Sequence, residues 1–362
     1  MTNRPVALVT GATRGIGRAI AVELSSTHRI LVGGRDAARA GWALAGQARR
    51  LVRADPADPA QWADIDVPAA PWCAERFGRA FTDAVIGSAF RGYYFQDLAT
   101  TSASAALAMV AYGARPFTTL TADPGLEAVP RALASGLTIH YDSPVARLER
   151  GAHGAALVLA DGASVEADRV VLAVPGPRAA TLLDDPSPVE AELIATPYSP
   201  GLLVVVALSR RLADHELGGA YGLLASPGRS GDLAALCASS RAGHAAPGRD
   251  AVTVMFDGEA AGECIKRGTS DEELVGRAVE SLCALAPSLE AAVDQASSRV
   301  VRIPAAMPTC RVGRASLVRR YRGEQSGPVV LAGDYLAFPW SDSAALTGLW
   351  AANRVRLAAE RG

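Results

Sequence analysis

The first fifty residues alternate short apolar runs with apolar residues at helical spacing. Residues 5–9 and 29–32 are apolar runs that predict strands, and residues 18–24 between them have the spacing of an amphipathic helix. Residues 36–50 predict a second helix and residues 49–53 a third strand. Because strands that alternate with helices form parallel, doubly wound sheets, this region predicts an α/β fold with a Rossmann-like dinucleotide-binding domain.

The pattern changes further along the chain. Short extended runs at residues 137–140, 144–149, 155–159 and 169–174 predict a β-meander, with Asp161-Gly162 as a turn. Near the end, residues 328–332 form a buried-type strand, and Ala344 begins an apolar helix that reaches Ala352. We therefore expect a discontinuous α+β substrate domain beside the parallel sheet. The expected segments are a βαβ unit (1–66), a helical part of the substrate domain (67–135), a return to the nucleotide-binding domain (136–180), more substrate domain (181–310) and a closing strand and helix (311–362).

The composition is that of a globular protein and excludes several functions. Of the 362 residues, 49% are hydrophobic and 20% are charged, and the net charge is −1, so no nucleic-acid-binding surface is expected. The longest apolar run, residues 202–208, is far below the ~20 residues that span a bilayer. The five cysteines show no paired spacing, which is typical of free thiols in a reducing compartment. The histidines show no metal-ligand spacing. The expectation is a cytoplasmic protein with no integral membrane segment and no metal site.

A glycine-rich loop between the first strand and helix indicates nucleotide binding. Gly11, Gly15 and Gly17 are spaced Gly-x-x-x-Gly-x-Gly, which lets the backbone and the helix N-terminus approach a pyrophosphate. With Thr10 before it, this motif resembles the short-chain dehydrogenase/reductase family over about residues 4–66. The binding residues expected here are Gly11, Thr13, Arg14, Gly15, Ile16 and Gly17.

Two arginines favour NADP as the nucleotide of this loop. Arg35 follows the second strand where an acid would bind a ribose hydroxyl, and Arg14 adds a second guanidinium that suits a 2′-phosphate. The resemblance also implies that Asp55, after the expected third strand, contacts the adenine. However, the chain contains no Tyr-x-x-x-Lys pair, since its only lysine, Lys266, has Gly262 four residues before it. We therefore expect no short-chain-reductase catalysis, and the sequence assigns no catalytic residue.

The remainder of the chain resembles a different superfamily. Phe77–Thr82, Arg91–Tyr94, Val165–Pro175 and Gly333-Asp334 are similar to segments of the amine oxidase, protoporphyrinogen oxidase and phytoene desaturase superfamily. This resemblance covers roughly residues 75–360 and lacks the N-terminal FAD motif of that superfamily, so the chain looks like a chimera of two families.

The second resemblance implies FAD as the cofactor and suggests which residues hold it. It places the backbone near Val145 close to the adenine, Gly333 against the cofactor, and Asp334 on the ribityl chain. It also implies that a helix start at Ala345, Thr347 and Gly348 faces the flavin C2 carbonyl. The aromatic residues Tyr93, Tyr94, Phe338 and Trp340 are candidates both for a cavity wall beside the flavin and for ordinary core positions.

Three interpretations remain open from the sequence. In the first, the chain is an FAD-dependent oxidoreductase that passes a hydride from a small-molecule substrate to flavin N5, with the βαβ unit holding adenine and pyrophosphate. In the second, it is an NADP-binding protein without reductase chemistry. In the third, it is an inactive gene-fusion remnant.

Overall fold

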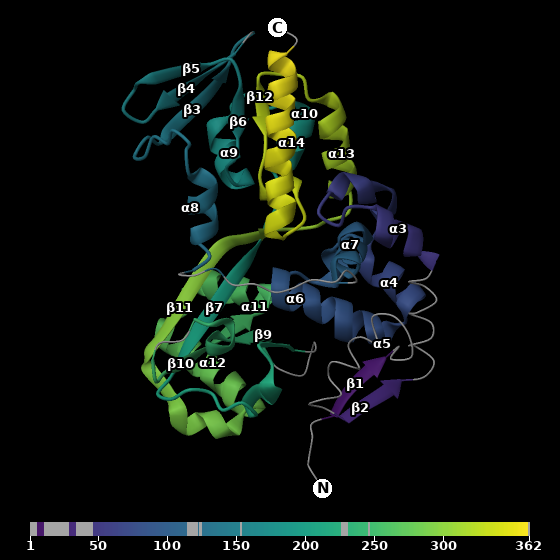
Figure 1. Ribbon diagram of the computed structural model, residues 1–362, viewed down its shortest axis with the longest axis vertical. Helices are drawn as coiled ribbons and strands as arrows, with labels where there is room; N and C mark the ends of the chain where they lie inside the picture. The colour runs from purple at the N-terminus through teal and green to yellow at the C-terminus, as the bar shows by residue number, and fades with distance from the viewer. Residues whose placement is uncertain are drawn as a thin grey trace.

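The computed structural model describes residues 6–10, 29–33, 46–113, 122, 125–152, 154–225, 231–244 and 247–360. Figure 1 shows an upper part around the long helix α14 (Ser341–Ala359) and a lower part built on an antiparallel sheet. Two long strands, β7 (Tyr198–Leu208) and β11 (Val293–Pro308), run from one part to the other. The ends of these two strands therefore mark the joint between the parts.

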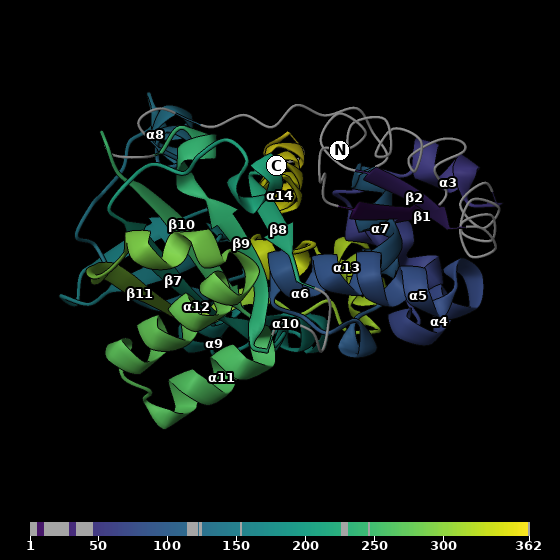
Figure 2. The same ribbon diagram turned by 90° about the horizontal axis from the view of Figure 1, so that it is seen from below.

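The lower part is a five-stranded antiparallel sheet covered by two helices. Its strand order is β11-β7-β10-β9-β8, where β8 is Gly222–Leu224, β9 is Leu233–Ala238 and β10 is Asp250–Phe256. Buried and half-buried residues alternate along β10, as expected when one face of a sheet packs on a core. That core is shared with α11 (Gly258–Arg267) and α12 (Asp271–Leu285), which Figure 2 shows on the outer side of the sheet.

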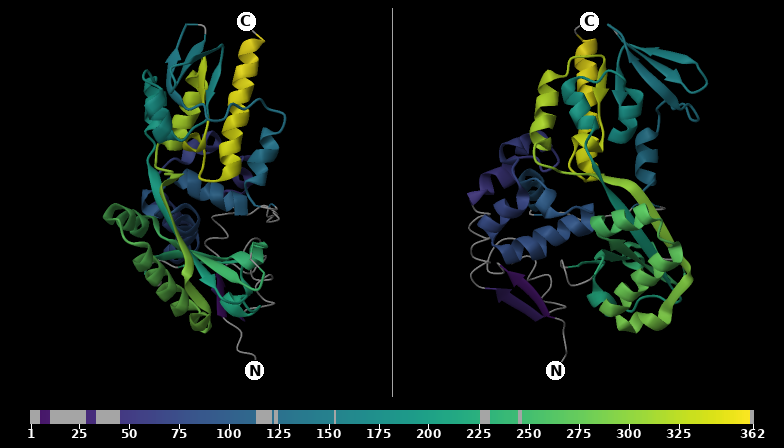
Figure 3. Two further views of the ribbon diagram at one scale, coloured as in Figure 1. Left: turned by 90° about the vertical axis from the view of Figure 1, so that its left-hand side faces the viewer. Right: turned by 180° about the vertical axis from the view of Figure 1, so that it is seen from behind.

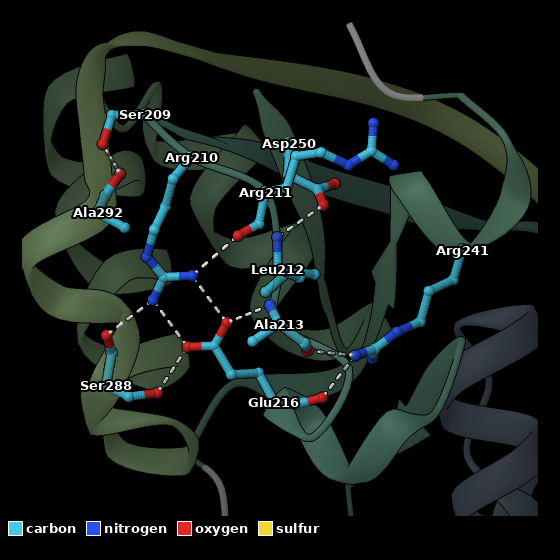
Figure 4. Close-up of polar contacts among 10 residues, drawn as sticks. All are labelled: Ser209, Arg210, Arg211, Leu212, Ala213, Glu216, Arg241, Asp250, Ser288 and Ala292. Atoms are coloured by element: carbon cyan, nitrogen blue, oxygen red, sulfur yellow. Dashed lines mark hydrogen bonds and ion pairs between the residues drawn. The ribbon is translucent and has the colours of Figure 1, made fainter. Parts of the chain in front are cut away.

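The loop after β7 is fixed by one buried carboxylate (Figure 4). Glu216 accepts hydrogen bonds from both terminal nitrogens of Arg210 at 2.8 Å, from the Ala213 N–H at 2.8 Å and from the Ser288 hydroxyl at 2.9 Å. Arg241 donates to backbone carbonyl oxygens of the same loop, including those of Ala213 and Glu216. These bonds satisfy the loop's polar groups and stabilise this end of the sheet.

A group of helices packs beside the sheet around one apolar core. Buried Trp62, Phe77 and Phe90 belong to this core. The elements, in chain order, are α3 (Ala48–Arg53), the 3-10 helix Pro59–Ile65, α4 (Ala69–Phe77), α5 (Arg79–Phe81), the π-helical segment Thr82–Gly87, α6 (Ser88–Tyr94) and α7 (Ala103–Gly113). A further helix, α8 (Ala128–Ala134), leads toward the upper part.

The upper part is layered about two parallel strands, β6 (Val170–Leu172) and β12 (Val329–Leu331). Val329 and Leu331 pack with α9 (Gly176–Leu182), α10 (Pro188–Ile194) and α13 (Arg314–Glu324), whereas Val330 packs with α14. A three-stranded meander, β3 (Val145–Arg150), β4 (Ala155–Leu159) and β5 (Ser164–Ala167), extends beside this layer, as both views of Figure 3 show. The mixed α/β class expected from the sequence is confirmed.

The parallel strands of the described residues form two separate pairs. Strand β1 (Val6–Thr10) pairs in parallel with β2 (Arg29–Gly33), and within the described residues this pair is separate from β6 and β12. Figure 1 shows β1 and β2 at the lower right, away from β12.

Side chains of α13 explain why β12 offers no open edge to another strand. The Ala332 N–H bonds to Leu172 of β6, so the neighbouring Leu331 N–H points to the opposite edge. There it donates to the Tyr321 hydroxyl at 2.7 Å, and Gln325 donates to the Val329 carbonyl at 3.2 Å. Such side-chain caps take the place of a neighbouring strand.

Three local predictions of secondary structure are wrong. The expected strand at residues 49–53 belongs to helix α3, where arginine and leucine are good helix formers and Val52 is 78% exposed, so there is no buried strand face. The extended run at residues 137–140 forms no strand. Helix α14 begins at Ser341, three residues before the predicted Ala344.

Candidate active site

The carboxyl ends of β6 and β12 form the expected location for a ligand in a parallel layer. Beyond β12, Gly333 has a φ of +132°, a conformation that favours glycine. A Cβ at this position would lie 3.2 Å from the Tyr335 ring and 3.4 Å from the Val174 carbonyl oxygen, which follows β6. The two strand ends therefore approach each other closely at Gly333, and a side chain there would disturb the contact.

Asp334, the next residue, is held by a tyrosine that the sequence analysis did not identify. The hydroxyl of Tyr198, at the start of β7, donates to Asp334 Oδ1 at 2.6 Å and accepts the Gly176 N–H at 3.1 Å. Burial, and then the hydrogen bond to Asp334, raise the pKa of Tyr198 well above its usual range, so the hydroxyl remains a donor at physiological pH. No motif marks Tyr198, because its role depends on where β7 starts in space.

The predicted helix residues lie one turn into α14. Since α14 begins at Ser341, the first-turn N–H groups, which have no backbone partner within the helix, belong to Ser341 and its neighbours and not to Ala345, Thr347 and Gly348. Thr347 instead connects the helix to the turn: its buried Oγ1 accepts the Gly333 N–H at 2.8 Å and donates to the Ala344 carbonyl at 2.7 Å. The prediction that these residues form the helix start is thus wrong by one turn.

Small residues nevertheless leave room beside this helix. Ala345 and Gly348 are exposed, and a Cβ added at Gly348 would meet no atom within 4 Å. The surface of α14 at Ala345 and Gly348 is therefore open, and the resemblance predicts that the flavin end of the cofactor lies there.

Aromatic side chains surround the residue that precedes α14. The ring of Trp340 lies 5.7 Å from Tyr94, 6.0 Å from Tyr112 and 5.0 Å from Phe338, measured between ring centroids. The Trp340 Nε1 atom is buried and has no hydrogen-bond partner within the part of the chain that the structure describes. Of the four aromatic candidates, Phe338 is a core residue, Tyr93 is 57% exposed, and Tyr94 and Trp340 are half-buried.

The remaining cofactor-binding predictions concern Val145, Asp55 and the residues of the glycine loop and second strand. Val145 begins β3, and its carbonyl oxygen accepts a hydrogen bond from Arg178 at 2.8 Å. Asp55 follows helix α3 and not a strand, and its side chain accepts the N–H of Ala57 in the same turn at 2.9 Å. The glycine-loop residues and the second-strand arginine lie outside the described residues; these are Gly11, Thr13, Arg14, Gly15, Ile16, Gly17 and Arg35.

A separate cavity of about 570 Å³ lies between helices α4, α5 and α6 on one side and the start of α11 on the other. Arg91 and Asp257 line it and form an ion pair of 2.8 Å. Of the described residues predicted to bind the cofactor, none lines this cavity. Over the described ranges, no group of three potential metal ligands converges, and no helix is long and apolar enough to cross a membrane.

Solved structures of several oxidases have a similar fold. A protein described as a protoporphyrinogen oxidase from Exiguobacterium sp. 255-15 has a TM-score of 0.65 and 16% identity, over 97% of this chain and 80% of that one. Putrescine oxidase bound to putrescine has a TM-score of 0.61 and 16% identity, over 98% and 99% of the two chains. Cyclohexylamine oxidase from Brevibacterium oxydans IH-35A has a TM-score of 0.59 and 17% identity, over 88% and 74%. No curated protein matches the sequence.

A family model described as "Flavin containing amine oxidoreductase" matches residues 29–356. The match starts well before residue 75, where the sequence analysis places the beginning of this resemblance, and it includes Arg35 and Asp55. Neither the short-chain dehydrogenase resemblance nor the NADP alternative is supported by these comparisons. FAD is therefore the cofactor, the substrate is a small molecule, and the reaction is a flavin-dependent oxidation-reduction. The chain belongs to the family of flavin containing amine oxidoreductases.

Proposed function

We propose that this protein oxidises a small amine, with the flavin held at the carboxyl ends of β6 and β12 and at the start of α14. The observation that carries the proposal is the Gly333-Asp334 turn, which brings a positive-φ glycine, an oriented carboxylate and a helix start to one place. When bound, FAD supplies the capacity to accept a hydride from the substrate and to return the electrons to an acceptor.

The residues of the chain have distinct parts in this proposal. Asp334 accepts a hydrogen bond from a ribityl hydroxyl while Tyr198 fixes the orientation of its carboxylate. The N–H groups at the start of α14 stabilise negative charge on the flavin ring, since a helix N-terminus carries a partial positive charge. Thr347 keeps the turn and the helix in register through its bond to Gly333.

An amine is the substrate class that fits the aromatic group at Trp340. The rings of Tyr94 and Tyr112 each pack against Trp340 at a tilt, and the Asp342 carboxylate interacts with the Tyr112 hydroxyl. Ring faces beside a carboxylate attract organic cations. The family description and the amines named for two neighbouring structures support the same class.

Flavin retention tests the site. We expect the purified protein, soaked with FAD and desalted, to keep a visible flavin spectrum, and Asp334→Ala to retain much less. A lost charged hydrogen bond of about 1.5–3 kcal/mol weakens binding about 10- to 100-fold. Asp250→Ala is the control, because Asp250 is buried and accepts three backbone N–H bonds in the lower sheet, away from the site. Unchanged retention in Asp334→Ala would remove Asp334 from the site.

Anaerobic reduction tests the substrate class. Mixing the loaded protein with a panel of alkyl and aryl amines should bleach the flavin absorbance for at least one amine, and Trp340→Ala should slow that reduction. Flavin that dithionite bleaches but no amine does would contradict an amine substrate.

A further inference from the structure

A buried arginine forms hydrogen bonds to the backbone of the turn that carries Asp334. Arg314 is the first residue of α13 and is only 8% exposed. Its guanidinium donates to the carbonyl oxygens of Asp334 at 2.9 Å and Tyr335 at 3.2 Å, and also to that of Ala337. One arginine therefore binds three of the four carbonyl groups between residues 334 and 337.

The same arginine connects this turn to the end of β11. Its Nη1 lies 3.3 Å from the Cys310 sulfur, and Cys310 in turn donates its backbone N–H to the Gln96 side chain at 3.0 Å. Cys310 is buried and follows the last residue of β11 by two positions. Arg314 thus occupies the joint between the upper and lower parts.

Burying a guanidinium is costly unless all its donors are used, so this arrangement needs a reason. The partners of Arg314 are neutral carbonyl groups and a thiol, whereas Arg322, on the same helix, pairs with the carboxylate of Asp58 at 2.6 Å. A carboxylate neutralises a buried arginine, but carbonyls at fixed spacing use its planar geometry. The hydrogen bonds from Arg314 therefore determine the course of the backbone at residues 334–337.

We propose that Arg314 is a positioning residue for the flavin site. Its hydrogen bonds to the carbonyl groups of the turn fix the backbone there, so that Asp334 and the start of α14 keep the position in which they bind the cofactor. This inference rests on the proposed function for its ligand, but the hydrogen bonds from Arg314 to the turn are a property of the chain alone. It assigns a role in cofactor binding to a residue whose hydrogen bonds go to the chain itself.

The test compares Arg314→Lys with Arg322→Lys. Lysine keeps the charge but is a point donor that cannot reach three carbonyls in one plane. Arg322 is the matched control because it is a similarly buried arginine of α13, with side-chain exposure of 15%, and its ion pair is with Asp58, which lies outside residues 333–337. Two quantities are measured on the full-length proteins: the FAD dissociation constant, and amide hydrogen exchange of the cofactor-free protein in peptides that cover residues 333–340.

In Arg314→Lys we expect FAD to bind about tenfold more weakly and exchange in residues 333–340 to accelerate about tenfold. Arg322→Lys should leave both within about twofold of the wild type. Unchanged amide hydrogen exchange in Arg314→Lys, or equal acceleration in both variants, would overturn the proposal that Arg314 fixes the turn. Faster exchange with an unchanged FAD dissociation constant would overturn its role in cofactor binding. If the wild type binds no FAD, the proposed function and this role both fail, and the exchange data still decide whether Arg314 holds the turn.

Discussion

Replacing Tyr198 with phenylalanine removes one oxygen atom and two hydrogen bonds from the candidate site. The bond from the hydroxyl to Asp334 Oδ1, at 2.6 Å, is charge-assisted, and such bonds contribute about 1.5–3 kcal/mol. The bond from the Gly176 N–H to the hydroxyl, at 3.1 Å, adds about 0.5–1.5 kcal/mol. Asp334 is half-buried, so water replaces part of the loss, and we expect a net effect of about 1–3 kcal/mol.

That loss should appear in cofactor binding as well as in stability. If the Tyr198 hydroxyl orients Asp334 for the flavin, each 1.4 kcal/mol lost from binding raises the FAD dissociation constant about tenfold. The assay is titration of the cofactor-free protein with FAD, together with urea unfolding. Tyr321→Phe is the control, because it also removes a buried hydroxyl that accepts a backbone N–H, but on the edge of β12.

The comparison of the two variants decides the interpretation. We expect both to lower the free energy of unfolding, but only Tyr198→Phe to weaken FAD binding strongly. Equal FAD affinity in Tyr198→Phe and the wild type would show that the Tyr198–Asp334 bond serves only the scaffold, and the assignment of Asp334 to the cofactor would lose its structural support.

Two further changes test the turn and the lower sheet. Gly333→Ala should cost about 1–3 kcal/mol of stability and reduce flavin retention, because alanine is strained at a φ of +132° and its Cβ would lie 3.2 Å from the Tyr335 ring; unaltered stability would show that the turn readily rearranges. Hydrogen bonds from Arg210 lower the pKa of Glu216 to about 2, so the stability it confers is complete above the unfolded value of about 4.3 and is lost as the pH falls through 2. Urea midpoints measured from pH 6 to pH 2 should therefore fall more steeply for the wild type than for Glu216→Gln, and parallel curves would contradict this.

The parts of the fold that the sequence predicts well are those determined by local rules. A buried apolar run followed by Gly333 requires a turn after a strand, and the structure has that turn, because only glycine adopts its backbone conformation easily. Likewise, Asp161-Gly162 predicts a turn in the meander, and Gly162 has a φ of +87° between β4 and β5. Such features depend on neighbours within a few residues, so they are visible in a linear pattern.

The incorrect predictions concern choices that local rules leave open. Residues 49–53 are apolar and arginine-rich, a composition that suits either a strand or a helix, and the packing of the helical core decides for a helix. The start of α14 was misplaced because Ser341-Asp342-Ser343 is polar, although Ser343 is buried and bonds to the carbonyl of Ala57, far away in sequence. A partner at such a distance gives no signal in one sequence.

Tyr198 and Arg314 show what this limitation means for the site. Each acts on the turn at Gly333-Asp334, but Tyr198 is 136 residues from its Asp334 partner, and Arg314 contacts carbonyl groups, which have no sequence identity. Both residues lie where β7 starts and β11 has just ended, which is the joint between the lower sheet and the upper layer. The turn at Gly333-Asp334 is therefore fixed from the start of β7 and the start of α13 as well as by its own strands. A shift of β7 relative to the upper layer would move Tyr198 and disturb its bond to Asp334, whereas Arg314, as part of α13, belongs to the upper layer and would stay with the turn.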